Sequence, residues 1–166
     1  MNALTEPRAV EGVGLSDEHF ETFYRDEYAA AARLAYLLCG TQLISDDIVQ
    51  DSFLAIEKHF SGVDRPSAYL RTAVVRRCAS WHRTNSRRAG LLPKLYTDSS
   101  VAADDSELFD VLATLPYEQR AALTLRFWCD MNLAEIADAL GCRVGTVKSS
   151  ISRGLARLRL ELKEVM

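Results

Sequence analysis

Two stretches of this sequence combine many cationic side chains with no acidic ones. Residues 65–97 hold seven Arg and one Lys, and residues 141–159 hold four Arg and one Lys, without an Asp or Glu in either. Guanidinium and ammonium groups bind the phosphate backbone of nucleic acids, chiefly by releasing its counterions. Because the two stretches lie far apart in the sequence, we expect two separate contacts with nucleic acid.

The second basic stretch belongs to a segment with the pattern of a helix-turn-helix. Small Ala137 would let two helices approach closely, and Gly141 would supply the turn between them. The wedge between the helices would be filled by the apolar side chains of Ile136, Leu140, Val147 and Ile151. The outer face of the second helix would carry hydroxyl and cationic side chains suited to a major groove: Arg143, Thr146, Lys148, Ser149, Ser152 and Arg153. An ordinary helical hairpin with a solvated basic face is the alternative, but the coincidence of these features favours DNA binding.

The first basic stretch should form one long helix that starts near Pro66, where a missing N–H is tolerated. Cationic and aromatic side chains of this helix suit a single strand whose bases are exposed for stacking: Arg71, Arg76, Arg77, Trp81, Arg83, Arg87 and Arg88. Trp81 also shares a stripe with Leu70 and Val74, so burial in the core explains this ring as well as a stacking role does.

The rest of the chain is acidic. Residues 1–64 hold twelve acids against four bases and residues 98–140 hold nine against two, so the formal net charge of −3 conceals a block pattern. A helix with Ser45 as its N-cap would bury Ile48 and Phe53. Its other face would present Asp46, Asp47, Gln50 and Asp51. These acids would repel phosphates, so a basic protein partner suits that face better, with a merely solvated surface as the alternative.

Apolar residues recur at spacings of three and four from Ser16 to Met166, which predicts an all-α chain. The periodicity lapses over residues 89–105, which we interpret as a flexible linker between two small helical domains, 16–88 and 106–166. Residues 1–15 are expected to be disordered. In the second domain a helix from Tyr117 to about Cys129 should face a core with the side chains of Ala121, Leu125 and Trp128. The separation of charge along the chain would permit the two domains to fold against each other in the free state.

Several classes of protein do not fit the sequence. Its start lacks the basic and apolar regions of a secretory signal, and no apolar run approaches the roughly 20 residues that span a bilayer, so we expect a cytoplasmic protein without membrane insertion. The four cysteines stand far apart without a Cys-x-x-Cys pair, which argues against a metal site. No nucleophile and base pair and no phosphate-binding glycine loop is visible, so neither a cofactor nor enzymatic activity is expected.

Taken together, these features resemble the extracytoplasmic-function (ECF) sigma factors, the smallest members of the sigma-70 class of bacterial transcription initiation factors. The resemblance covers about residues 20–160. Its most specific parts are four segments: Ser45–Phe53, Tyr69–Arg88, Leu115–Arg120 and Glu135–Ser149. Residues 145–149 and 155–159 look most like the SigE-like subgroup of actinobacteria.

The resemblance implies a factor that joins core RNA polymerase and directs it to promoters. The acidic face would bind the clamp helices of the polymerase's largest subunit, and the second domain would dock on the polymerase flap. The arginine helix would open and hold the minus-ten element as a single strand, and the helix-turn-helix would read the double-stranded minus-thirty-five element. Members of this family are commonly held inactive by an anti-sigma protein, so such a partner is expected here. Many relatives place an Asn near Arg76, in the part that shapes a pocket for a flipped base, so the minus-ten base preference stays open.

The main alternative is a helix-turn-helix regulator that binds an operator as a dimer without joining polymerase. It would explain residues 133–159 equally well, but it leaves the arginine helix and the acidic face without a role. A helical adaptor with no nucleic-acid role would leave both basic stretches unexplained.

Overall fold

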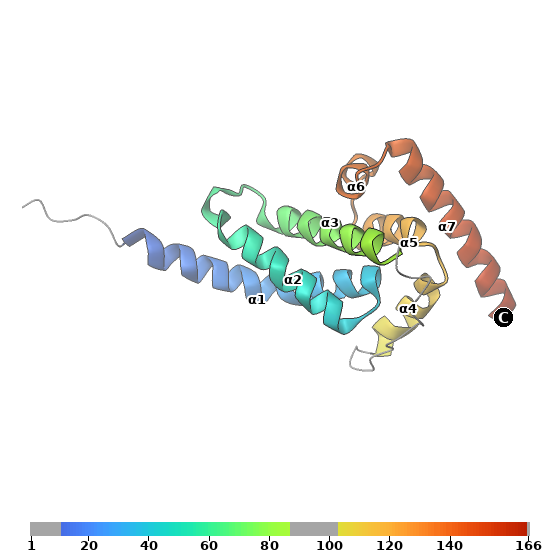
Figure 1. Cartoon of the computed structure of the whole chain (residues 1–166), viewed down its shortest axis with the longest axis horizontal. Coiled ribbons are helices and arrows are strands. Elements are labelled where there is room, and N and C mark those ends of the chain that lie inside the picture. The colour runs from blue at the N-terminus through green and yellow to red at the C-terminus, as the bar shows by residue number, and fades with distance from the viewer. Residues whose placement is uncertain (1–10, 87–102, 166) are drawn as a thin grey trace, which may run out of the picture.

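The computed structural model describes residues 11–86 and 103–165, and these ranges are almost wholly helical, with no strand among them (Figure 1). The first half holds α1 (Glu11–Cys39), α2 (Gln42–Glu57), the 3-10 turn η1 (Phe60–Gly62) and α3 (Pro66–Ser86). The second half holds α4 (Ala103–Ala113), α5 (Tyr117–Leu123), the π-helical turn η2 (Thr124–Trp128), α6 (Leu133–Leu140) and α7 (Val144–Val165). The predicted all-α class is confirmed.

The first half is a bundle in which the long α1 lies along α2 and α3 (Figure 1). Phe53 of α2 is 2% exposed and sits in a cluster of aromatic rings from α1, with the centroid of Tyr24 at 4.6 Å and that of Phe23 at 5.9 Å. Edge-to-face and tilted aromatic pairs of this kind add to the gain from burying the rings. Because Ile48, Val49 and Ile56 are buried with Phe53, the opposite face of α2 must point to solvent.

The start of α2 differs from the prediction. Thr41, not Ser45, is its N-cap, and the Thr41 hydroxyl accepts a hydrogen bond from the Ile44 N–H at 3.3 Å. Gly40, with φ of +78°, ends α1 just before it, so the chain reverses within two residues and the next available hydroxyl caps the helix. Ser45 is instead buried, and its hydroxyl donates to the carbonyl of Thr41 at 2.7 Å.

The outer bounds of the domains also differ in detail from the expectation. Helix α1 begins at Glu11, ahead of the expected Ser16, so the backbone of residues 11–15 is helical. Residues 1–10 and most of the expected linker, 87–102, lie outside the described residues. The exact division into domains at 16–88, 89–105 and 106–166 therefore stays a prediction.

The helix-turn-helix is present as predicted. Asn132 caps α6 through a reciprocal capping box with Glu135, and Gly141 ends α6 in the left-handed region with φ of +65°. Ile136 and Val147 are fully buried between α6 and α7, and Ala137 is buried beside them. Leu140 and Ile151, the remaining wedge residues, pack at the edge of the same core.

The segment after α5 corrects one expectation. Ala121 and Leu125 are buried as predicted, but Trp128 is 41% exposed. The chain forms a π-helical turn here, in which the N–H of Cys129 donates to the carbonyl of Thr124 at 3.2 Å. The extra residue in such a turn rotates the side chains that follow, so Trp128 leaves the stripe that a regular α-helix would have buried.

Candidate nucleic-acid and protein interfaces

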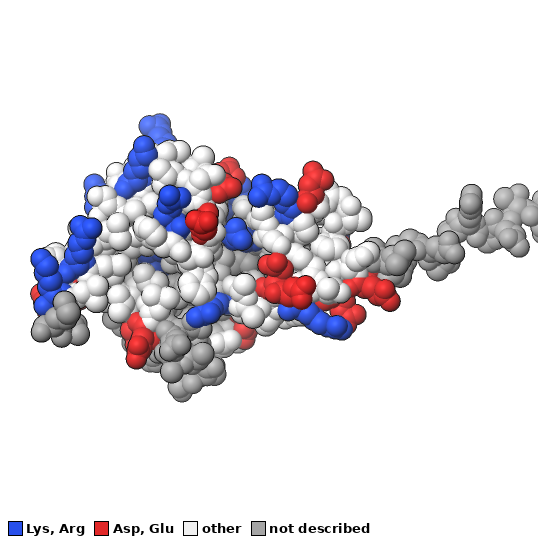
Figure 2. Space-filling view, turned by 180° about the vertical axis from the view of Figure 1, so that it is seen from behind, with Lys and Arg blue, Asp and Glu red and all other residues white. Residues whose placement is uncertain are grey.

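The outer face of α7 carries the residues predicted to read a major groove. All six candidates are exposed: Arg143, Thr146, Lys148, Ser149, Ser152 and Arg153. Figure 2, which views the molecule from behind, shows blue Lys and Arg side chains gathered at the left-hand end, where α7 lies, and red acids toward the half formed by α1. The helix therefore presents hydroxyl and cationic groups together, as direct and phosphate contacts to duplex DNA require.

The position of α7 is set by a close approach to α5. A Cβ added at Gly154 would lie 2.8 Å from Cδ1 and 3.2 Å from Cγ of Leu123, so only glycine fits without displacing that buried side chain. The glycine thus holds α7 against α5 and leaves the opposite side of α7 in solvent.

The cations of α3 point in several directions rather than along one face. Arg76 is exposed and forms an ion pair with Asp138 of α6 at 3.4 Å. Arg83 is exposed but lines a cleft between α3, α5 and α7, and half-buried Arg71 lines a second cleft beside η2. Arg77 is half-buried, and Arg87 and Arg88 lie outside the described residues. In this arrangement much of the candidate strand-binding surface faces the second half of the protein.

Trp81 packs partly against the core. Its ring is half-buried and meets the imidazole of His82 edge to face, with centroids 5.5 Å apart. The burial reading of the sequence therefore fits this ring, although part of it stays accessible to solvent.

The acidic face of α2 is exposed as expected, with one qualification. Asp47, Gln50 and Asp51 are exposed, and Asp46 is half-buried with its carboxylate accepting a bond from the Gln42 side chain at 3.1 Å. The Gln50 amide donates to the Tyr24 hydroxyl at 2.9 Å. That bond orients the amide toward α1.

Two exposed leucines extend this face, and the sequence analysis overlooked them. Leu43 is 73% exposed and Leu54 is 55% exposed, and helical spacing places them on the same side of α2 as Asp47 and Asp51. We call Leu43, Asp47, Gln50, Asp51 and Leu54 the α2 ridge. Exposed large apolar side chains bordered by polar ones mark surfaces that bind other proteins. The sequence could have indicated these two residues, because their spacing places both leucines outside the buried stripe of α2.

A second overlooked feature is an apolar groove in the second half. It runs between α4, η2 and α7 and is lined mainly by Leu108, Leu112, Phe127, Trp128, Leu155 and Leu158. Phe127 is 65% exposed, which is unusual for so large an apolar ring. The π-helical turn is what directs Phe127 and Trp128 into the groove, and no periodicity in the sequence signals that turn.

A buried polar cluster lies where the two halves meet. Arg120 of α5 is 7% exposed and donates to the carbonyls of Leu38 at 2.9 Å and Leu115 at 3.3 Å. Its guanidinium also lies 3.1 Å from Nε2 of His82, and the His82 ring stacks on Tyr117 with centroids 4.1 Å apart. A guanidinium can only donate, so Nε2 of His82 must be an unprotonated acceptor.

The electrostatics of this cluster agree with its geometry. Burial, together with the neighbouring Arg120 guanidinium, lowers the pKa of His82 to about 4. Burial also lowers the pKa of Arg120 and raises that of the Tyr117 hydroxyl, which has no hydrogen-bond partner. The cluster therefore holds one desolvated cation against neutral groups.

Other kinds of site find little support in the part of the chain that the structure describes. No group of three or more His, Cys, Asp or Glu side chains there could hold a metal ion. None of the described helices combines the length and apolar character needed to cross a bilayer.

Comparison with known families identifies both halves. The family described as Sigma-70 region 2 matches residues 23–88, and that described as Sigma-70, region 4 matches residues 106–158. The chain is similar to the RNA polymerase sigma-E factor of Streptomyces avermitilis, with 34% identity over 87% of this chain and 85% of that protein. It is also 30% identical to the ECF RNA polymerase sigma factor SigL of Mycobacterium tuberculosis, over 84% of this chain and 87% of the relative.

Solved structures share the fold at lower sequence identity. The sigma factor RpoE of Bartonella quintana, crystallised with the anti-sigma factor NepR, superposes with a TM-score of 0.69 at 22% identity, over 88% of this chain and 98% of that one. CnrH, solved with the cytosolic domain of CnrY, gives a TM-score of 0.63 at 22% identity, over 89% and 90% of the two chains.

The buried histidine predicts how stability depends on pH. Because the folded-state pKa of His82 is lowered from 6.5 to about 4, unfolded chains bind its proton more readily, and stability should be lost as pH falls from about 6.5 toward 4. Replacing His82→Gln keeps an acceptor for Arg120 but cannot titrate, so the decrease in Tm between pH 7 and pH 5 should become smaller. The matched control is His59→Gln, because the side chain of His59 is exposed. This control should keep the wild-type decrease in Tm between pH 7 and pH 5. Equal pH dependence in all three proteins would contradict the burial of His82.

Proposed function

Because the chain belongs to the ECF sigma factors of the sigma-70 class, we propose that it binds core RNA polymerase and directs it to specific promoters. The observation that supports this most is the combination in one chain of the acidic α2 ridge, the basic α3 and the helix-turn-helix of α6 and α7. An operator-binding regulator would use only the last of these three.

The α2 ridge is the proposed contact with the clamp helices of the polymerase's largest subunit. Its carboxylates, Asp47 and Asp51, would pair with basic side chains of the partner, and Leu43 and Leu54 would supply apolar contact at the ends. Charge pairs steer the encounter and fix its register, whereas buried apolar area supplies much of the affinity. Asp46 and Gln50 would act mainly through side-chain positions that are fixed by hydrogen bonds, Asp46 to Gln42 of α2 and Gln50 to Tyr24 of α1.

The apolar groove is the proposed binding site for a second protein partner. Its exposed Phe127 and its leucine walls suit the apolar face of an amphipathic helix of a partner, and the polymerase flap is the partner proposed here. An anti-sigma protein, such as the NepR bound to RpoE of Bartonella quintana, would block assembly if it covered the same groove.

Promoter recognition would divide between two helices. The N-terminal part of α7 would enter the major groove of the minus-thirty-five element with Arg143, Thr146 and Lys148 near the bases and phosphates. The cations of α3 would hold the backbone of the melted minus-ten strand while extruded bases are captured. Strand separation costs stacking and pairing energy, and these contacts would offset part of that cost.

No catalytic step is assigned to this chain. We propose that it is not an enzyme, that RNA synthesis is carried out by the polymerase it joins, and that it needs no cofactor. It would act in the cytoplasm, where core polymerase and promoter DNA are found.

The α2 ridge can be tested by removing its charges. Asp47→Ala combined with Asp51→Ala should weaken binding to core RNA polymerase by roughly tenfold, because two interfacial charge pairs are lost. Surface plasmon resonance with immobilised core enzyme would measure this. The control is Glu161→Ala, which removes an exposed acid from α7 and should bind as wild type does. Unchanged binding of the double variant would remove the ridge from the polymerase interface.

The recognition helix can be tested with duplex DNA. Lys148→Ala and Arg153→Ala should each weaken holoenzyme binding to a promoter that carries the upstream element by roughly 5- to 150-fold. Gel-shift titration at fixed salt would measure the effect. Lys163→Ala removes an exposed cation from the last turn of the same helix and serves as the control. If all three variants lost affinity equally, the contact would be diffuse attraction rather than recognition by the start of α7.

A further inference from the structure

A cleft of about 390 Å³ lies between α3, α5 and the helix-turn-helix, and the proposed function assigns no ligand to it. Much of its lining is apolar and includes the buried side chains of Ala79, Ala122 and Val147. Sites for small molecules enclose about 300–1,000 Å³ and combine mainly apolar walls with a few polar groups. This cleft therefore has the size and the lining of a site for a compact organic molecule.

Two stacked rings form part of the cleft wall. His82 of α3 and Tyr117 of α5 both line the cleft, and the centroids of their rings lie 4.1 Å apart. The guanidinium of Arg120 lies against both rings, 3.1 Å from Nε2 of His82 and 5.7 Å from the centroid of Tyr117. A flat ring would pack well against such a wall, because offset and edge-to-face contacts between aromatic rings are favourable.

The charged and polar groups at this wall favour an anion. Arg120 is 7% exposed, its Nε has no hydrogen-bond partner, and burial keeps water from screening its charge. Because Nε2 of His82 accepts from Arg120, the hydrogen of the neutral ring is on Nδ1, and that nitrogen can only donate. Arg83 adds a second cation, whereas Glu118 is the one acid among the described residues that line the cleft. Two cations against one acid give the cleft a positive potential.

Hydroxyl groups of α7 add further donors. Thr146 is exposed and Ser150 is half-buried, and both line the cleft. They are four residues apart, so they lie on the same face of the helix. A carboxylate accepts hydrogen bonds through two oxygens, and hydroxyl and guanidinium groups can donate to both. The cleft thus combines an apolar lining with several donors for one carboxylate.

We propose that this cleft binds a compact aromatic carboxylate of one or two rings. The aromatic part packs against Ala79, Ala122 and the stacked pair of His82 and Tyr117, and the carboxylate faces Arg83 and the hydroxyls of α7. Binding removes apolar side chains from water and places a negative charge close to a buried cation whose direct contacts are neutral. This inference goes beyond the proposed sigma function and does not depend on it.

The proposal can be tested with three acids and their uncharged amides. The acids are benzoate, 2-naphthoate and indole-3-carboxylate, and each amide keeps the ring but removes the charge. Isothermal titration calorimetry on the full-length chain should give a Kd tighter than about 1 mM for at least one acid, and binding at least about tenfold weaker for its amide. The acid that binds should also raise Tm, because a ligand of the folded chain stabilises it by mass action.

A variant that fills the cleft tests where the acid binds. Ser150→Phe places a ring in the cleft from its half-buried rim and should abolish binding of the acid. The matched control is Ser149→Phe, because Ser149 is the preceding residue of α7, is exposed and does not line the cleft. This control should bind the acid as the wild type does. Far-UV circular dichroism would establish that both variants are folded.

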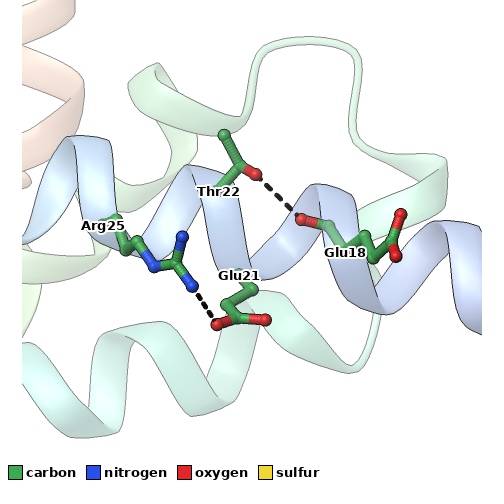
Figure 3. Close-up of polar contacts among 4 residues, drawn as sticks. All are labelled: Glu18, Glu21, Thr22 and Arg25. Carbon is green, nitrogen blue, oxygen red and sulfur yellow. Dashed lines mark hydrogen bonds and ion pairs between the residues drawn. The ribbon is translucent and has the colours of Figure 1, made fainter.

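A second variant tests the charge that the cleft recognises. Arg83→Gln should weaken binding of the acid by about tenfold and leave binding of the amide unchanged. Arg83 is exposed, so its replacement removes no core packing. The control is Arg25→Gln, because Arg25 is an exposed arginine of α1 that pairs with Glu21 of the same helix (Figure 3). This control should keep the wild-type affinity for the acid.

Each contrary result has a definite meaning. If none of the three acids bound the folded wild type with a Kd tighter than about 1 mM, the proposal would be overturned. Equal affinity for acid and amide, or an unchanged affinity in Arg83→Gln, would show that the cleft does not recognise a carboxylate. Binding that survives in folded Ser150→Phe would place the acid outside this cleft. If Ser150→Phe failed to fold, the comparison of Arg83→Gln with Arg25→Gln would decide the question.

Discussion

Burial of one side of every helix in a shared apolar core is the constraint from which the functional surfaces follow. Phe53 and Ile48 commit one face of α2 to that core, and this leaves Asp47 and Asp51 in solvent. In the same way, close packing of Gly154 on Leu123 commits one face of α7 and leaves Lys148 and Arg153 outside. The functional surfaces are therefore formed by the side chains that lie opposite the buried faces of these helices.

The core also continues from one half into the other, and this gives the molecule a second property. Leu37 and Tyr36 of α1 are buried against α4, while Arg120 reaches back to the Leu38 carbonyl. The boundary between the halves is therefore built from aromatic rings, leucines and one desolvated cation. Attraction between charges across the boundary contributes less, since Arg76 and Asp138 are an exposed pair at 3.4 Å.

Local chemistry made some of this structure predictable. Ala137, Gly141 and the wedge residues specify the helix-turn-helix because each acts on its immediate neighbours. The cap at Thr41 and the π-helical turn that ends at Trp128 were missed, since each depends on a choice among local hydrogen bonds. The direction of the α3 arginines could not be predicted at all, because charge in a sequence does not specify which tertiary neighbour a helix face will meet.

The most direct test of the account is whether this chain enables core polymerase to open promoter DNA. Permanganate oxidises unpaired thymines, so a promoter duplex with suitably spaced elements can be probed with the chain, with core RNA polymerase, and with both. The account predicts reactive thymines at the minus-ten element only when both are present. Protection of a duplex site by the chain alone, with no reactive thymines after core polymerase is added, would contradict it and favour an operator-binding regulator.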